Sequence, residues 1–263
     1  MHSQENSTGK PLADAKWLEQ HHNAKIHERT SFAKMLSHYS PKRVVDLGCA
    51  SGLWLDTLDK VMPKDCEFIG VDCDPASLDV AKAKSINWQR KTSFLRLDIE
   101  KEVDKIPSAD LTLAFNIFPY ISDLDIFLHR LSLRIPKGIL AIRQYDGASI
   151  RFGPMSTAER QKLETSLRVA TESTQHFHHY DMDRTFHALY SSEYDHVNCW
   201  FELFERTSPF DESFIPYYRD MLLWTCDHIS ENSSRFLHNW LNEDQNYKMN
   251  RYFYEVDLVA IVS

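Results

Sequence analysis

The chain has 263 residues, of which 43% are hydrophobic, and this is enough for one large domain or one domain with an insertion. Its formal net charge of −8 argues against a broad phosphate-binding surface, so we expect no nucleic-acid partner. Its five cysteines form no C-x-x-C pair, and neither a basic apolar leader nor an apolar run of membrane-spanning length is present. These features predict a cytoplasmic protein with reduced thiols and no membrane association.

The first forty residues precede the predicted sheet. Residues 1–12 are polar, whereas the segment 13–39 carries apolar residues at helical spacing, among them Trp17 and Phe32. We therefore predict a polar tail followed by one or two helices, and we assign residues 1–40 to a tail and a helical lid.

The stretch Val44–Gly52 is the most informative part of the sequence. An apolar strand, Arg43–Leu47, runs into a turn that contains two of the chain's seven glycines, and a helix follows. Because glycine has no β-carbon, such a turn lets a ligand come close to the backbone. The order Gly48-x-Ala50-x-Gly52 is neither the dinucleotide fingerprint G-x-G-x-x-G nor a P-loop, which needs a lysine.

Four more apolar strands follow, and several of them end in a polar side chain. They are predicted at Phe68–Asp72, Phe94–Ile99, Leu111–Asn116 and Gly138–Arg143. A helix that opens with proline, Pro75–Ala83, follows the first of them. This alternation of strands and helices predicts an α/β fold with a mostly parallel sheet, in which ligands bind beyond the carboxyl ends of the strands.

The remaining part of the chain departs from this alternation. Residues 154–192 form a mostly polar helical stretch, which is an insertion after the fifth strand. The segments 197–206 and 252–262 alternate apolar and polar residues, as paired strands do. Between them, 211–229 and 232–241 are predicted to be helices.

The turn resembles the first motif of the class I S-adenosylmethionine (SAM)-dependent methyltransferases, an acid followed by G-x-G-x-G. Asp46, Gly48 and Gly52 match this motif, and Ala50 stands where the family usually has its middle glycine. Together with the later strands, the resemblance covers roughly residues 43–145.

The resemblance implies a seven-stranded, mostly parallel sheet with an antiparallel last strand and helices on both faces. Residues 41–263 would form this SAM-dependent methyltransferase domain, with the helical insertion at 154–192. The alternating segments near the C-terminus would be strands six and seven, and the N-terminal helices would cover the SAM site.

The resemblance also implies contacts with SAM. Asp72 would accept hydrogen bonds from the ribose hydroxyls, Asp98 would meet the adenine amino group, and Ile99 would pack on the adenine ring. In the lid, His27 and Arg29 are candidates for a donor near the SAM carboxylate. The full set of predicted cofactor-binding residues is Asp46, Gly48, Cys49, Ala50, Gly52, Asp72, Cys73, Asp98, Ile99 and Asn116.

The acceptor site is expected past the fourth and fifth strands and beneath the insertion. Methyl transfer requires alignment of the two reactants and, for a hydroxyl or ammonium acceptor, a general base. The densest set of titratable groups is Gln175–Asp181. The predicted catalytic residues are His178, His179 and Tyr145, and the predicted substrate-binding residues are Tyr120, Arg143, Asp146 and Arg151.

A metal site is not expected. The neighbouring histidines lack the cysteine or H-x-x-x-H partners of a zinc site. The metal-dependent catechol-type methyltransferases gather carboxylates after strand four, where this chain has Asn116.

We therefore predict methyl transfer from SAM to an oxygen or nitrogen of a small-molecule acceptor. The alternatives are an RNA or protein methyltransferase and a protein that binds SAM without catalysis. The sequence leaves open whether the chain forms a homodimer.

Overall fold

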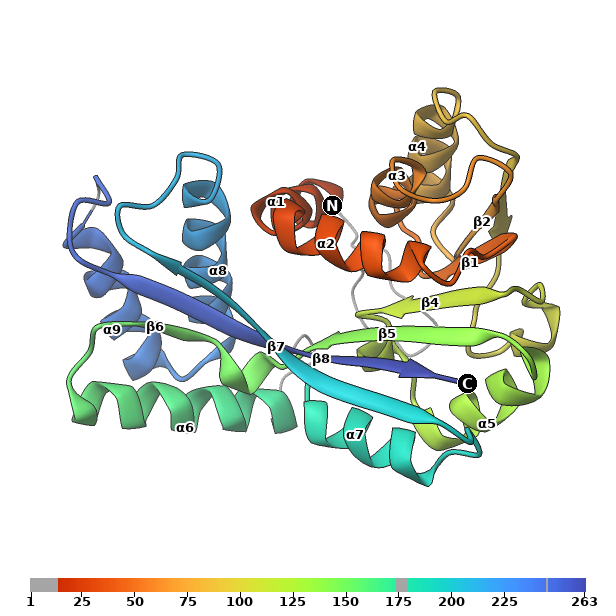
Figure 1. Cartoon of the computed structure of the whole chain (residues 1–263). Helices are drawn as coiled ribbons and strands as arrows, with labels where there is room; N and C mark the ends of the chain where they lie inside the picture. Colours follow the sequence, from red (N-terminus) through yellow and green to blue (C-terminus); the bar gives the residue numbers. More distant parts are fainter. Residues whose placement is uncertain (1–13, 174–178, 245) are drawn as a thin grey trace.

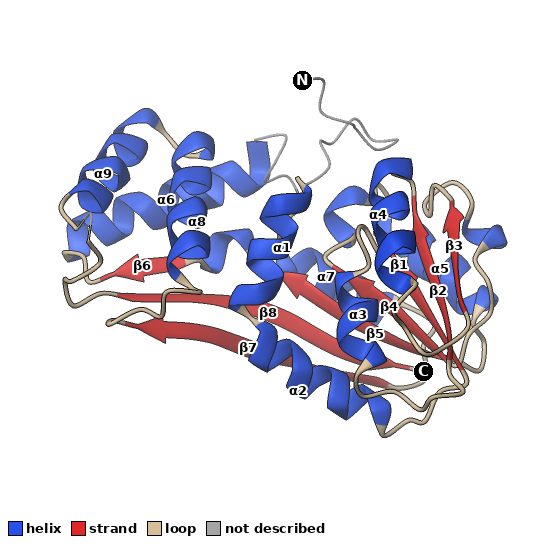
Figure 2. Ribbon diagram, turned by 90° about the horizontal axis from the view of Figure 1, so that it is seen from above, coloured by secondary structure: helices blue, strands red, loops and turns tan. Residues whose placement is uncertain are grey.

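The computed structural model describes residues 14–173, 179–244 and 246–263, and a single mixed sheet runs through this part of the chain (Figures 1 and 2). Its strands are β1 (Arg43–Leu47), β2 (Glu67–Asp72), β3 (Thr92–Arg96), β4 (Leu111–Phe115), β5 (Ile139–Tyr145), β6 (Arg151–Gly153), β7 (Val197–Thr207) and β8 (Tyr252–Val262).

The strand order is β3-β2-β1-β4-β5-β8, with β1 to β5 parallel and β8 antiparallel to β5. Both β6 and β7 pair antiparallel with β8. The expected α/β fold with its antiparallel last strand is confirmed. The strand β6 was not predicted, because three residues are too few to show a periodic pattern in the sequence. The strand order reverses between β1 and β4, which is the switch point where open α/β sheets bind ligands.

Nine helices occur in the described part of the chain. They are α1 (Ala15–Ala24), α2 (Ile26–Ser37), α3 (Leu53–Asp59), α4 (Pro75–Ser85), α5 (Leu124–Arg134), α6 (Thr157–Ser173), α7 (Met182–Ser191), α8 (Ile215–His228) and α9 (Glu231–Asn242). Among the described residues, none of these helices is long and apolar enough to cross a membrane.

Alternation along the strands divides the main core into two layers. Val44, Leu111 and Leu113 face the layer under α2, α3 and α4, and residues such as Val45 and Ile142 face α5 and α7. Figure 1 shows these two helical layers on opposite faces of the sheet. The apolar strands are therefore buried on both faces, as expected for a parallel sheet.

The strands β7 and β8 are long, and they run from the main sheet into a second lobe (Figure 1). This lobe packs α6, α8 and α9 and the short β6 around the first half of β8, with Phe152, Tyr218 and Phe253 in its core. The helices predicted within 154–192 are present but separate, because α6 joins the second lobe whereas α7 packs on α5 and the sheet. The second lobe is therefore built from two segments distant in sequence, not from one insertion.

Candidate active site

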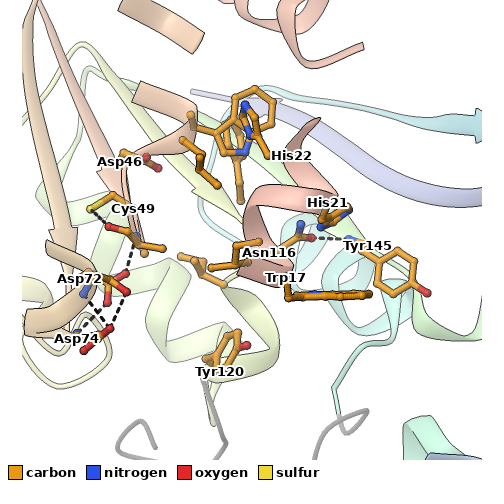
Figure 3. Close-up of a pocket in the computed structure, with 18 of the residues that line it drawn as sticks. Trp17, His21, His22, Asp46, Cys49, Asp72, Asp74, Asn116, Tyr120 and Tyr145 are labelled. Atoms are coloured by element: carbon orange, nitrogen blue, oxygen red, sulfur yellow. Dashed lines mark hydrogen bonds between the residues drawn. The ribbon is translucent and has the colours of Figure 1, made fainter. Parts of the chain in front are cut away.

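A pocket lies at the carboxyl ends of the parallel strands, between the main sheet, the second lobe and the N-terminal helices (Figure 3). We call the part formed by the strand ends the sheet side. It is lined by Asp46, Gly48, Cys49, Ala50, Asp72, Cys73, Asp98, Ile99 and Asn116. We call the opposite part the lobe side. It is lined by Trp17, His21, Tyr145, Tyr180, Tyr217, Met221, Trp224 and Glu255.

The turn after β1 adopts the left-handed backbone that its glycines permit. Gly48 has φ 68°, and a β-carbon there would lie 2.5 Å from Cγ2 of Ile117, so the pocket wall itself requires glycine. Ala50 has φ 44°, which is strained for a residue with a side chain. The chain thus keeps the turn conformation even where the family's middle glycine is replaced.

Gly52 does not line the pocket, contrary to the predicted cofactor contact. It has φ 75° at the N-cap of α3, and a β-carbon there would lie 3.3 Å from both Ala81 and Trp88. Gly52 therefore serves the start of α3 and the packing of α3 against α4.

Asp72, at the end of β2, joins two loops of the sheet side. Its Oδ2 accepts a hydrogen bond from the Ala50 N–H at 2.8 Å, and its Oδ1 accepts one from the Asp74 N–H at 2.8 Å (Figure 3). The first bond holds the strained Ala50 in place. Burial raises the pKa of Asp72, and these backbone bonds oppose that shift. Each carboxylate oxygen keeps a second lone pair for a ligand hydroxyl.

Asp46, near the end of β1, is a buried acid with an unsatisfied oxygen. Its side chain lines the pocket, the residue is only 2% exposed, and Oδ2 has no hydrogen-bond partner among the described residues. Burial raises the pKa of Asp46 well above its usual value, and the neighbouring Asp72 adds to the shift. An unpaired acid is costly to bury, so a cationic ligand group is the partner that this position suits.

The lid helices bring a fixed cation to the pocket lining. Arg29 of α2 donates to Nδ1 of His22 at 2.5 Å and stacks over Trp54 at 5.1 Å. Nε2 of His22 then donates to Oγ1 of Thr57 at 2.9 Å, and that hydroxyl donates to the Leu53 carbonyl. This chain of donors fixes His22 as the neutral Nε2–H tautomer. Burial lowers the pKa of Arg29 to about 10, so the guanidinium stays charged.

Of the two lid residues considered from the sequence, only Arg29 lines the pocket, because His27 is exposed.

The neutral histidines of α1 predict a loss of stability in acid. Burial, with Arg29 as the second cause, lowers the pKa of His22 from 6.5 to about 2. Between these values the unfolded chain binds a proton that the folded chain does not, so the free energy of unfolding should fall by about 1.4 kcal/mol per pH unit below pH 6.5. Urea unfolding from pH 7 to pH 5 measures this slope. His22→Gln should flatten it, and an unchanged slope would contradict the assignment.

Asn116 and Tyr145 connect the two sides of the pocket. Oδ1 of Asn116 accepts a hydrogen bond from the Tyr145 N–H at 2.8 Å, which ties the end of β4 to β5 (Figure 3). The Tyr145 hydroxyl is buried and has no partner among the described residues. Burial raises the pKa of Tyr145 well above 10. Tyr145, which is predicted to be a catalytic residue, therefore suits the role of a hydrogen-bond donor.

Three of the four predicted substrate-binding residues lie outside the pocket. Arg143 is buried against Phe32 and pairs with Asp257 at 2.9 Å and with Glu202 at 2.7 Å. Because side chains alternate along β5, Arg143 faces α2. On that face, acids from β7 and β8 neutralise its charge.

The other two are held within the second lobe and the loop that leads to it. Asp146 is buried and accepts a hydrogen bond from Ser149, and Arg151 donates to the Tyr254 hydroxyl at 3.1 Å. Arg184, a further cation of the predicted insertion, donates to the Phe118 and Ile121 carbonyls. Only Tyr120 of the predicted set lines the pocket, and its hydroxyl hydrogen-bonds to Tyr180.

Of the predicted histidine pair, His178 lies outside the described residues. His179 sits in a turn with φ 70° and does not line the pocket. Its neighbour Tyr180 is the residue that reaches the pocket. Among the residues that the structure describes, no group of three or more His, Cys, Asp or Glu side chains is arranged to hold a metal ion.

The lobe side holds a linked group of residues that the sequence analysis missed. The His21 ring stacks on Tyr217 with a centroid distance of 5.2 Å and an angle of 6° between the ring planes. The Tyr217 hydroxyl donates to Oε2 of Glu255 at 2.8 Å, and Nε2 of His21 lies 3.8 Å from Oε1 of Glu255. One sequence signal was available: Glu255 and Asp257 occupy buried positions in an otherwise apolar, alternating strand.

Comparisons with known proteins agree with this geometry. Residues 45–138 match the family model of a methyltransferase domain. This part of the chain is a class I SAM-dependent methyltransferase domain. Its cofactor is SAM. The fold is shared with the YcgJ protein of Bacillus subtilis, with a TM-score of 0.55 and 11% identity over 90% of this chain and 98% of that one.

Curated relatives match only part of the domain. A malonyl-[acyl-carrier protein] O-methyltransferase of Legionella pneumophila is 28% identical over 41% of this chain. A ubiquinone biosynthesis O-methyltransferase of Rhodopseudomonas palustris is 27% identical over 57% of it. A protein-lysine N-methyltransferase of Schizosaccharomyces pombe is 36% identical over 33% of it. The matches span 36%, 62% and 36% of these relatives, respectively.

Proposed function

We propose that this protein transfers the methyl group of SAM to an oxygen or nitrogen of a small-molecule acceptor. The observation that carries the proposal is that one pocket joins the acids at the strand ends and Arg29, which suit the polar parts of SAM, to the aromatic residues of the lobe side.

The sheet side fits the nucleoside part of SAM. Asp72 lies at the end of β2 with free lone pairs for the ribose hydroxyls, and Asp98 and Ile99 follow β3 for the adenine. Because β3 ends at Arg96, Asp98 and Ile99 lie in the loop beyond the strand and line the pocket.

The other end of the sheet side fits the amino-acid part of SAM. The unsatisfied Oδ2 of Asp46 would accept from the ammonium group, and Arg29 would pair with the carboxylate. An acid and a cation that line one pocket suit a zwitterion, and the pairing would relieve the cost of burying Asp46.

The protein's part in the reaction would be alignment and exclusion of water. When bound, SAM supplies a methyl group on a sulfonium centre, which activates the methyl carbon for in-line displacement. Asn116 of the sheet side accepts a hydrogen bond from the Tyr145 N–H of the lobe side (Figure 3), so an acceptor from the lobe side would meet the methyl group near Asn116. The aromatic walls of the lobe side would keep water from that position.

The charges of the pocket favour a small molecule over the alternatives. Arg29 is the sole arginine or lysine among the described lining residues, in a chain of net charge −8. An RNA acceptor would need more cations to neutralise its phosphates. A protein acceptor is the second candidate, since a protein-lysine methyltransferase is among the relatives.

Two measurements test the proposal in sequence. Calorimetric titration should show one saturable site for SAM and one for its demethylated product, S-adenosylhomocysteine. Incubation with radiolabelled SAM and with separate small-molecule, protein and RNA fractions should then place the label in the small-molecule fraction. Binding without transfer would indicate a non-catalytic protein, label in RNA or protein would favour those acceptors, and absence of SAM binding would reject the proposal.

A further inference from the structure

We propose that His21, oriented by Glu255, is the general base that removes the proton from a hydroxyl acceptor bound between the aromatic rings of the lobe side. This inference rests on the proposed methyl transfer and deepens it by naming the acceptor group and the residue that activates it.

The orientation of His21 is fixed by its surroundings. The imidazole comes from the lid helix α1, stacks on Tyr217 of α8, and directs Nε2 toward Glu255 of β8. Glu255 is fully buried and is itself held by the Tyr217 hydroxyl and by Lys25. At 3.8 Å this contact is an electrostatic one, and Nε2 has no hydrogen-bond partner among the described residues. A proton on Nε2 would face the carboxylate and leave Nδ1 as the nitrogen that accepts a proton, and the carboxylate would stabilise the imidazolium that forms.

The position of Glu255 follows from the course of the sheet. β5 pairs with β8 up to Asp257, and β6 pairs with β8 again from Tyr254. The segment that connects β5 to β6 therefore leaves a gap in the pairing along this edge of β8. Glu255 lies at this gap and is among the residues that line the pocket.

Burial, together with the neighbouring cations, keeps His21 neutral. Burial lowers the pKa of His21 well below 6.5, and Lys25 and Arg29 lower it further. The cationic and acidic groups near it alternate, since Lys25 lies beside both Glu255 and Asp257, and Asp257 pairs with Arg143. A neutral imidazole is the protonation state that a base requires at physiological pH.

The walls of the lobe side define the acceptor. Trp17 stacks with Trp224 at a centroid distance of 6.2 Å, and Tyr217 and Met221 of α8 continue this wall. Tyr145 and Tyr180 meet edge to face at 6.0 Å. No arginine or lysine is among the lobe-side residues in the described part of the chain. A flat, mostly apolar molecule with a hydroxyl group fits these walls.

The step balances without a further reactant. As the acceptor oxygen forms its bond to the methyl carbon, the carbon–sulfur bond breaks and its electron pair stays on sulfur. The hydroxyl proton passes to Nδ1 of His21 and afterwards to solvent. The products are a methyl ether, S-adenosylhomocysteine and one released proton.

A pair of probes separates a base from a structural histidine. 2-Naphthol needs a base, whereas 2-naphthalenethiol has the same shape and is ionised without help near neutral pH. His21→Gln should lower kcat for 2-naphthol by about 100-fold or more, the range for loss of a general base. It should change kcat for the thiol by less than about threefold, and naphthol binding, followed by tryptophan fluorescence, should be retained.

The controls cover a folding defect and the proposed function itself. His27→Gln, on the exposed face of α2, should leave both probes unaffected. Glu255→Gln keeps the side-chain shape and should lower kcat for naphthol by about tenfold with KM nearly unchanged. This variant tests the assignment of the base if the His21 variant does not fold. Equal losses for both probes, or full naphthol turnover in either variant, would overturn the assignment. Methylation of neither probe by a wild-type protein that binds SAM would reject this acceptor, and failure to bind SAM would reject the proposed function.

Discussion

Replacement of Asp72 by alanine is expected to weaken SAM binding by about 2–3 kcal/mol, or roughly 30- to 150-fold. The ribose hydroxyls would lose their hydrogen bonds to the carboxylate, which are strong because the acceptor is charged. The substitution would also remove the bond from the Ala50 N–H, so the strained turn that faces the cofactor would lose its support. Both effects act on the same side of the pocket. Calorimetric titration of wild type and variant with SAM measures the change.

Asp79→Ala provides the matched control for this prediction. Asp79 lies on the exposed face of α4 and pairs only with the exposed Lys82 among the described residues, outside the pocket. Its removal should leave SAM affinity unchanged. Urea unfolding of the Asp72 variant shows whether it remains folded. If a folded Asp72→Ala binds SAM as tightly as wild type, the ribose assignment is wrong.

Asp46→Asn is expected to separate stability from binding. Asp46 is buried, its pKa is raised by burial, and its Oδ2 has no hydrogen-bond partner among the described residues, so its charge opposes folding. A neutral amide of the same shape should leave the free energy of unfolding equal or higher, while SAM affinity falls by about tenfold or more because the ammonium group loses its charged partner.

The sign of the pH effect makes this prediction sharper. A carboxyl group whose pKa is raised in the folded state binds more protons there than in the unfolded chain, so stability falls as the pH rises above about 3.9. The gain in stability from the Asp46→Asn substitution should therefore be larger at about pH 8 than at about pH 5. Urea unfolding at the two pH values and titration with SAM measure both parts. A variant that is less stable than wild type and binds SAM normally would show that Asp46 is a structural acid.

The sequence predicted the residues of the sheet side well because the patterns that indicate them are local. A strand, a turn and a following acid are neighbours in the chain, so Asp46, Gly48 and Asp72 could be placed from the pattern alone. The boundaries of β1, β4 and β8 agree with the predicted strands to within one residue. The role of Gly52 could not be predicted in this way. Its neighbours Ala81 and Trp88 belong to a helix that is distant in sequence and to the loop after that helix.

The lobe side depends on contacts that no local pattern reveals. Arg143 follows the expected strand, but its partners Glu202 and Asp257 come from two strands near the other end of the chain. His21 and Glu255 are separated by most of the sequence and meet only because α1 packs against α8 beside β8.

A structure of the protein with bound S-adenosylhomocysteine tests the central claim most directly. It should place the adenine beside Asp98 and Ile99, the ribose hydroxyls within hydrogen-bond distance of Asp72, and the amino-acid end between Asp46 and Arg29. The sulfur should then point toward His21 and the aromatic walls of the lobe side. A product molecule bound in the reverse direction, or with its sulfur facing away from the lobe side, would contradict the proposed site and its reaction.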